Sequence, residues 1–193
     1  MYKRCPTAKG AAQQQILENT LFAMMQEMPF SSISVRSMCE RAEVSRKTFY
    51  RLFDNKEDVL AALIDHIYRS YIYFQMPKNQ IVPGPPEDLQ NFFYYWKQQT
   101  VLLDVLKANH KSSLLIERSV THIQEEDSNI LHSIGAENPS RSRETVLFFS
   151  SGCMALVIDW HETGYKKSVA EMADIFAKLL TTPPIRPEIL PEI

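Results

Sequence analysis

Cations and hydroxyl groups are concentrated in the stretch SRKTFYRLFDNKED, which runs from Ser45 to Asp58. Arg46 and Lys47 follow a serine that can cap a helix, and Thr48 and Tyr50 add hydroxyl groups within the next turn. Lysine and arginine neutralise phosphates, arginine also binds guanine, and hydroxyl groups bind phosphate oxygens. These residue types at this spacing indicate a surface that binds a polyanion.

The faces of the helix expected here are consistent with that chemistry. With about 100° between successive residues, Phe49, Leu52 and Phe53 point to one side. Lys47 and Arg51 point to the opposite side. The apolar side would pack against the protein and leave the cations exposed. A helix fits the major groove of B-DNA, where residues of its first turn reach base edges.

Two short helices, each opened by a serine, are expected over 34–41 and 45–53, with a turn at 42–44. This arrangement is typical of a helix-turn-helix. Arg36, in the first turn of the first helix, is placed to reach a base or a phosphate. Lys56 begins the next helix and is placed to hold the DNA backbone beside it.

A charged, solvated helix face is the alternative interpretation of these residues. It is the better interpretation for Glu40 or Arg41 taken alone. It explains the set poorly, because the helix lengths, the turn and the facing all agree with DNA binding. Cations in the first turn of a helix are also slightly unfavourable beside the helix dipole, which favours a functional reason for Arg46 and Lys47.

The segment from Ile33 to Leu63, ISVRSMCERAEVSRKTFYRLFDNKEDVLAAL, resembles the DNA-binding region of TetR/AcrR-type transcriptional regulators. The matching residues are Ile33, Val35, Ala42, Val44, Ser45, Thr48, Phe49, Tyr50, Phe53, Lys56, Glu57 and Leu60. The resemblance implies an all-α homodimer, with an N-terminal three-helix helix-turn-helix head and a C-terminal helical dimerisation and regulatory core. By position it implies DNA contacts for Arg36, Arg46, Lys47, Thr48, Tyr50 and Lys56. The hydroxyl of Ser45 is a further candidate.

Two positions depart from the family's pattern. Glu43 lies in the turn where glycine is common, and a left-handed backbone is less favourable for Glu than for Gly. We therefore expect modest strain or a slightly different turn. Leu52 lies where histidine is common, so one DNA contact of the family is absent.

Composition agrees with a helical, globular protein. The 193 residues are 45% hydrophobic, contain five glycines and show no period-2 alternation. The net charge is −2, but residues 1–58 hold nine Lys/Arg and seven Asp/Glu, so the basic charge is local. Three scattered cysteines predict no disulfide framework, and therefore a reducing cytoplasm. No signal segment or membrane span is expected, since a span needs roughly 20 apolar residues.

Helices are also expected over 11–28, 56–74, 87–108, 111–132, 139–163 and 168–180, the last with a capping box from Ser168 to Glu171. Residues 76–87 hold four prolines and a glycine and form the clearest break. We predict a DNA-binding domain over 1–55 and a regulatory and dimerisation domain over 56–193. The tail over 183–193 holds four prolines and is not expected to be helical.

The helix over 139–163 is apolar on more than one face, which predicts a two-fold interface with a second copy. The candidate interface residues are Phe148, Phe149, Leu156, Trp160 and, on the last helix, Phe176. The alternative is a wholly intramolecular core. A dimer would present two heads to a palindromic operator.

The aromatic run over 92–96 marks a candidate ligand pocket in the core. The candidate lining residues are Tyr94, Tyr95, Trp96, His110, His122 and Cys153. Plain core packing explains such a run equally well, and no charge cluster indicates a ligand. Some members of the family lack a usable pocket and work through a protein partner.

Enzyme and metal motifs are absent from the sequence. His161 and Glu162 begin like a zinc-protease helix, but the second histidine is missing. We expect neither a metal nor a cofactor. The prediction is a cytoplasmic, homodimeric repressor, released from a palindromic operator by a small molecule. The alternatives are a pocketless regulator or activator controlled by a protein partner, and an enzyme or carrier that does not use DNA.

Overall fold

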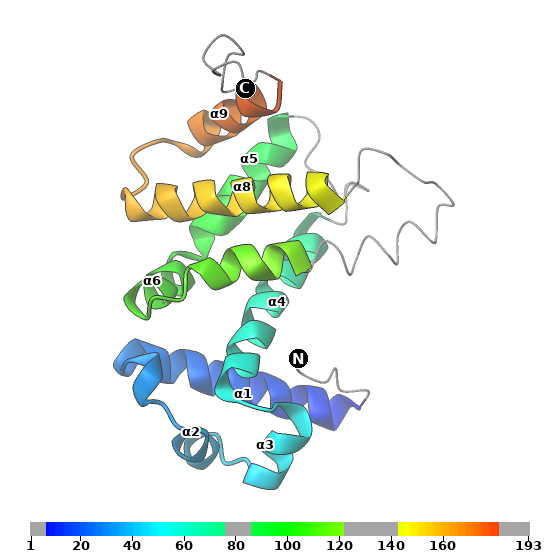
Figure 1. Ribbon diagram of the computed structural model, residues 1–193, viewed down its shortest axis with the longest axis vertical. Coiled ribbons are helices and arrows are strands. Elements are labelled where there is room, and N and C mark those ends of the chain that lie inside the picture. The colour runs from blue at the N-terminus through cyan, green and yellow to red at the C-terminus, as the bar shows by residue number, and fades with distance from the viewer. Residues whose placement is uncertain (1–6, 76–85, 122–142, 182–193) are drawn as a thin grey trace, which may run out of the picture.

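The computed structural model describes residues 7–75, 86–121 and 143–181, which form helices with no strand among them (Figure 1). The prediction of an all-α fold is confirmed. The elements are α1 (Ala8–Glu27), η1 (Phe30–Ser32), α2 (Val35–Arg41), α3 (Arg46–Leu52), α4 (Lys56–Gln75), α5 (Pro86–Gln98), α6 (Thr100–Ala108), α8 (Arg143–Glu162) and α9 (Val169–Thr181). Residues 113–121 are also helical.

Several predictions fall outside these residues. The break over 76–85, the helical segments over 122–132 and 139–142, and the tail from 182 onward lie outside the described part of the chain. The domain boundary at 55/56 stays a prediction. Within the described ranges, no helix is long and apolar enough to cross a membrane.

The single helix predicted over 87–108 is wrong, because the chain turns at Gln99 and forms α5 and α6 instead. The Gln99 amide donates to the Trp96 carbonyl at 3.0 Å, three residues back, which tightens the turn. The Thr100 hydroxyl donates to the Lys97 carbonyl at 2.6 Å. A local hydrogen bond of this kind competes with the regular helix ladder.

The head, by which we mean α1, η1, α2 and α3, forms one end of an elongated molecule, and α4 runs from it toward the other helices (Figure 1). α1 packs against both α2 and α4. Phe49, Leu52 and Phe53 are buried in the head with Leu17 and Leu21 of α1. The predicted inward face of α3 is therefore confirmed.

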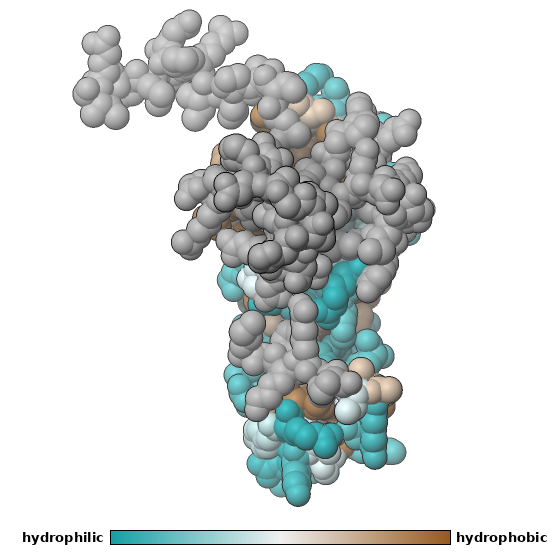
Figure 2. Space-filling model, turned by 90° about the vertical axis from the view of Figure 1, so that its right-hand side faces the viewer, coloured by the Kyte–Doolittle hydropathy of each residue, from teal (hydrophilic) through white to brown (hydrophobic). Residues whose placement is uncertain are grey.

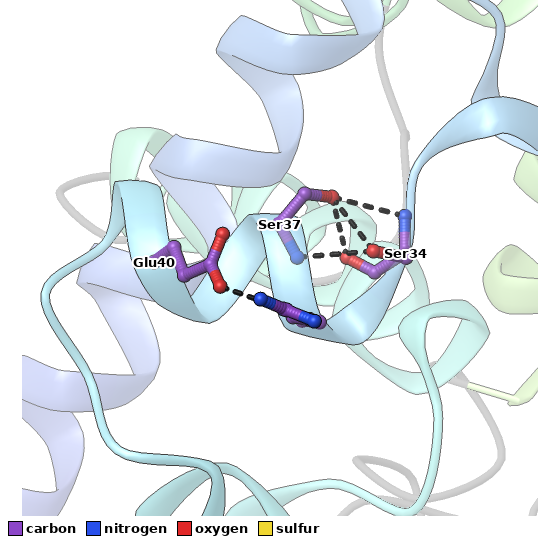
Figure 3. Close-up of polar contacts among 4 residues, drawn as sticks. Ser34, Ser37 and Glu40 are labelled. Atoms are coloured by element: carbon purple, nitrogen blue, oxygen red, sulfur yellow. Dashed lines mark hydrogen bonds and ion pairs between the residues drawn. The ribbon is translucent and has the colours of Figure 1, made fainter.

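Serine caps fix where α2 and α3 begin. The Ser34 hydroxyl accepts from the Ser37 amide at 3.0 Å, and the Ser37 hydroxyl accepts from the Ser34 amide at 3.2 Å, completing a capping box (Figure 3). The Ser45 hydroxyl accepts from the Thr48 amide at 3.1 Å. Between the two helices, Glu43 has φ 53°, so of the two outcomes left open for this turn the chain adopts the left-handed conformation that is less favourable for a residue other than glycine.

Polar contacts join α4 and α6 to their neighbours. Glu18 on α1 is fully buried and contacts His66 on α4. Arg118 forms two hydrogen bonds to the Asp65 carboxylate of α4, at 2.7 and 2.6 Å. The Asn109 side chain, just after α6, accepts from the Phe30 amide at 2.6 Å and donates to the Met25 carbonyl at 3.3 Å.

The apolar core continues to the far end of the molecule. α5 packs against α8 and α9, and α8 also packs against α6. The Phe93 ring contacts the rings of Trp160 and Phe176, with centroids 5.8 and 6.2 Å apart. The predicted capping box at the start of α9 is confirmed, since Ser168 and Glu171 exchange hydrogen bonds at 2.7 and 3.2 Å.

Two of the predicted dimer-interface residues lie in the core of their own chain. Trp160 and Phe176 are buried inside their own chain, so they have little surface to offer a partner. The mixed apolar faces of α8 arise partly because the helix packs between neighbours in its own core. Phe148 is 72% exposed and Leu156 half-buried, and for these the interface stays a prediction. The side chain of Phe149 lies outside what the structure describes.

Candidate nucleic-acid interface

The outer face of α3 carries two cationic side chains that form no ion pair or hydrogen bond within the described part of the chain. They are Arg46 and Lys47, and both are exposed. Tyr50 is 48% exposed, and its ring meets the buried Phe49 ring edge-on at 5.2 Å. Arg51 is exposed as well, but its guanidinium donates to Gln13 of α1 at 3.0 Å. The free cations are therefore those of the first turn.

The predicted hydroxyl contacts lie beside these cations. The Ser45 hydroxyl, which caps α3, also donates to the Thr48 hydroxyl at 3.0 Å. Ser45 is exposed and Thr48 half-buried. A phosphate contact from either would compete with this local pair, so contact with DNA stays a prediction for both.

A hollow of about 240 Å³ lies between α2 and α3, lined by Arg36, Cys39, Glu40, Val44 and Arg46. Arg36 of α2 and Arg46 of α3 both line this hollow. Burial raises the pKa of the Cys39 thiol more than the nearby Arg46 charge lowers it, so the thiol stays protonated. The surface around the head is largely hydrophilic in the view of Figure 2.

Lys56 has contacts that the sequence did not predict. Its ammonium group donates to the carbonyls of Phe30, Ile33 and Ser31, at 2.7, 2.8 and 3.4 Å. It also lies 4.5 Å from the centroid of the Phe30 ring. An ammonium group has three N–H donors, and all three are directed at the segment that precedes α2. This geometry favours an internal role for Lys56 over the predicted phosphate contact.

The predicted ligand-lining residues are not gathered around one site. Tyr94 is 51% exposed and His110 is exposed at the end of α6, whereas Tyr95 and Trp96 are buried. The Tyr95 hydroxyl donates to the Ile67 carbonyl at 2.7 Å, and burial raises the pKa of Tyr95 to about 12. Five consecutive helical residues cover every face of α5, which separates these side chains.

The two remaining ligand candidates differ in what the structure describes. Cys153 is partly buried, and desolvation raises the pKa of its thiol to about 12. Such a thiol behaves as a packing group rather than as a nucleophile. His122 lies outside the described residues.

Sequence reasoning missed two residues that shape the interface. Glu40 binds Arg36, with 2.8 Å between its Oε1 and the arginine Nε. The spacing of four residues along a helix was a readable signal for this pair. Asn109 holds the Phe30 amide from a position 79 residues away, and no local pattern indicates such a contact.

Together, a capped short helix with an apolar inner face and free cations outside, set in a three-helix head, defines a helix-turn-helix DNA-binding protein. Residues 19–63 match the family described as bacterial regulatory proteins, tetR family. Residues 85–182, just over half of the chain, match the family described as transcriptional regulator C-terminal region. The chain belongs to the TetR family of transcriptional regulators.

A solved structure supports the fold. The Lin0861 protein from Listeria innocua superposes with a TM-score of 0.67, covers 93% of this chain and 94% of its own, and is 18% identical in sequence. At that identity the likeness shows the fold alone. No curated protein matches the sequence.

Replacing Lys56 distinguishes an internal role from a DNA contact. We expect Lys56→Met to lower the free energy of unfolding by about 1.5–3 kcal/mol, because three carbonyls lose a charged hydrogen-bond donor. Urea denaturation measures the change. Lys47→Met is the matched control, and as an exposed, unpartnered lysine it should change stability by less than about 0.5 kcal/mol. Unchanged stability of Lys56→Met, with a shallower salt dependence of DNA binding, would show a phosphate contact instead.

Proposed function

We propose that this regulator binds a palindromic operator as a homodimer and represses transcription until a small molecule binds its helical core. The observation that carries the DNA-binding part is the pair of free cations, Arg46 and Lys47, on the outer face of α3. The inner face of the same helix is anchored by Phe49 and Leu52. The helix therefore presents a fixed cationic edge, with the hydroxyl of Tyr50 beside it.

This edge suits the major groove for two reasons. Residues in the first turn of a recognition helix reach base edges, and that is where Arg46 and Lys47 lie. Arg36, on the facing helix, lines the same hollow as Arg46 and extends the surface toward a neighbouring base or phosphate. Ser45, Thr48 and Tyr50 supply hydroxyls for the DNA backbone.

The double variant Arg46→Ala, Lys47→Ala tests the DNA-binding face. We expect it to lose about 100-fold or more in affinity for an operator selected from random double-stranded DNA, since each base contact contributes about 1–3 kcal/mol. Fluorescence anisotropy at several salt concentrations measures the affinity. The control Lys107→Ala, Lys166→Ala removes the same charge from exposed positions outside the head and should bind like the wild type. If Arg46→Ala, Lys47→Ala binds the operator as tightly as the wild type, the outer face of α3 is not the DNA-binding surface.

Exposed apolar side chains on α8 and α9 support the dimer. Phe148 is 72% exposed, and Leu147 beside it and Leu179 on α9 are exposed as well. A monomeric protein gains nothing by leaving a phenylalanine in water, whereas a two-fold interface buries it on both copies at once. Two heads held at a fixed spacing would then meet the two half-sites of a palindrome.

Light scattering of the wild type at micromolar concentration should give about twice the chain mass of 22.3 kDa. Phe148→Glu should shift the mass toward the monomer, because it places two carboxylates in an apolar interface. Val101→Glu, on an exposed position of α6, is the control and should remain dimeric. A wild type that stays monomeric would contradict the dimer. A Phe148→Glu variant that stays dimeric would show that the interface does not include Phe148.

Two buried donors in the core support an effector site. The Trp96 indole N–H and the Ser150 hydroxyl are buried and have no hydrogen-bond partner among the described residues. A buried donor without a partner costs about 1–3 kcal/mol, and a ligand with an acceptor oxygen would recover that energy. The ligand would then favour the conformation that accommodates it and shift the spacing of the heads.

Thermal-shift screening of small molecules with acceptor oxygens tests the effector site. Compounds that stabilise the wild type and release it from its operator should stabilise Trp96→Phe by less, because phenylalanine cannot donate a hydrogen bond. Trp160→Phe is the control, since its indole N–H already donates to the Lys167 carbonyl at 2.9 Å. The effector site would be wrong if no compound releases DNA, or if those that do stabilise Trp96→Phe equally.

A further inference from the structure

An ion pair joins two exposed residues of α2 that lie one helical turn apart. The Arg36 Nε atom donates to Glu40 Oε1 at 2.8 Å, and the two side chains are 78% and 64% exposed (Figure 3 shows Glu40 in this pair). Both residues line the hollow between α2 and α3, with Arg46 on its other side. The pair is therefore part of the surface that the proposed function presents to the operator.

The geometry of the pair selects which edge of the arginine is free. A guanidinium group carries five N–H donors in a planar fork. Because Nε is occupied by Glu40, the two terminal nitrogens of Arg36 remain, and they form the edge that can bind guanine O6 and N7 together. Hydrogen bonding to Glu40 also limits rotation of the guanidinium plane, so less side-chain entropy is lost when the base is bound.

The negative charge of Glu40 has an effect on DNA binding that is separate from the geometry of the pair. A carboxylate on a DNA-binding face repels phosphates, so an unpaired one there would only weaken binding. Paired with Arg36, it cancels the attraction of that arginine for the phosphate backbone, which is the same for every sequence. Hydrogen bonds from the terminal nitrogens to a base are retained. The pair thus reduces non-specific binding more than it reduces base recognition.

The orientation of α2 is well determined, which gives the pair a fixed place. The capping box of Ser34 and Ser37 fixes the first turn of the helix. Met38 and Cys39 are buried on the side that faces the head. Arg36 and Glu40 are consequently held on the outer side of α2.

We propose that Glu40 is a positioning residue that presents the terminal nitrogens of Arg36 to a guanine and limits the attraction of Arg36 for phosphates. This inference rests on the proposed function, because it assumes that the face formed by α2 and α3 binds DNA. It adds a residue outside the recognition helix that sets sequence preference at one base pair of each half-site.

Four single variants separate the two roles of Glu40. Glu40→Ala removes both the acceptor and the charge, while Glu40→Gln keeps an oxygen acceptor for Arg36 and removes only the charge. Arg36→Ala identifies the base pair that the arginine recognises. Glu57→Gln, an exposed acid in the first turn of α4, is the charge-matched control. The wild type is first used to select an operator from random double-stranded DNA. Each variant is then titrated against single-base substitutions of that operator at several salt concentrations.

Arg36→Ala should lower discrimination at one guanine-containing base pair by roughly 5- to 100-fold, the range for a bidentate contact. Glu40→Ala should lower discrimination at the same base pair, and Glu40→Gln should retain most of it. Both Glu40 variants should bind non-specific DNA more tightly, with a salt slope steeper by about 0.9, because one more phosphate is neutralised. Glu57→Gln should match the wild type in discrimination, and thermal melts should show that all four variants are folded.

Several outcomes would overturn the inference. It is wrong if Glu40→Ala keeps full discrimination at the base pair that Arg36→Ala affects, or if Arg36→Ala affects no base pair. It is also wrong if neither Glu40 variant changes the salt slope. In these cases the proposed function stands, provided that Arg46→Ala, Lys47→Ala still loses operator binding. If the wild type selects no sequence at all, the proposed function itself fails.

Discussion

The burial of Phe49, Leu52 and Phe53 is the constraint on which the rest of the DNA-binding surface depends. α3 has only seven residues, and an isolated helix of that length is not stable in water. Its formation and its orientation therefore come from packing in the core of the head, where α3 contacts α2. Once those three side chains face inward, helical geometry places Arg46 and Lys47 on the opposite, exposed side. Stability of the head and presentation of the cations are two consequences of the same packing.

A second set of contacts ties the head to the helices beyond it. The amide of Phe30 is held by Asn109 of the segment after α6, and its carbonyl by Lys56 of α4. The Phe30 ring also lies beneath the ammonium groups of Lys56 and Lys111, 4.5 and 5.0 Å from its centroid. Phe30 begins η1, the short helix that comes before the Ser34 cap of α2. The position of α2, and of the Arg36–Glu40 pair that it carries, is thus mechanically linked to α4 and α6.

Features set by neighbours in sequence were predictable, and features set by distant neighbours were not. The caps at Ser34 and Ser45 depend on residues within one turn, and the structure confirms them. The inner face of α3 followed from helical periodicity. The contacts of Lys56 come from carbonyls more than twenty residues away, and the burial of Trp160 comes from packing between helices. Neither could be read from the position of Lys56 at the start of its helix or from the apolar faces of the helix that carries Trp160. The break at Gln99 is accompanied by a hydrogen bond from the Thr100 hydroxyl to the Lys97 carbonyl. Similar bonds also form in helices that continue without a break, so the sequence does not mark this one.

The central claim is that the outer face of α3 enters the major groove while its inner face stays packed. A structure of the wild-type protein bound to its selected operator tests this most directly. The account predicts Arg46 and Lys47 within hydrogen-bond distance of base edges or phosphates, with Phe49 still buried and the Arg36–Glu40 pair intact beside a guanine. A complex in which α3 lies away from the DNA, or in which Phe49 leaves the core to reach it, would contradict the account.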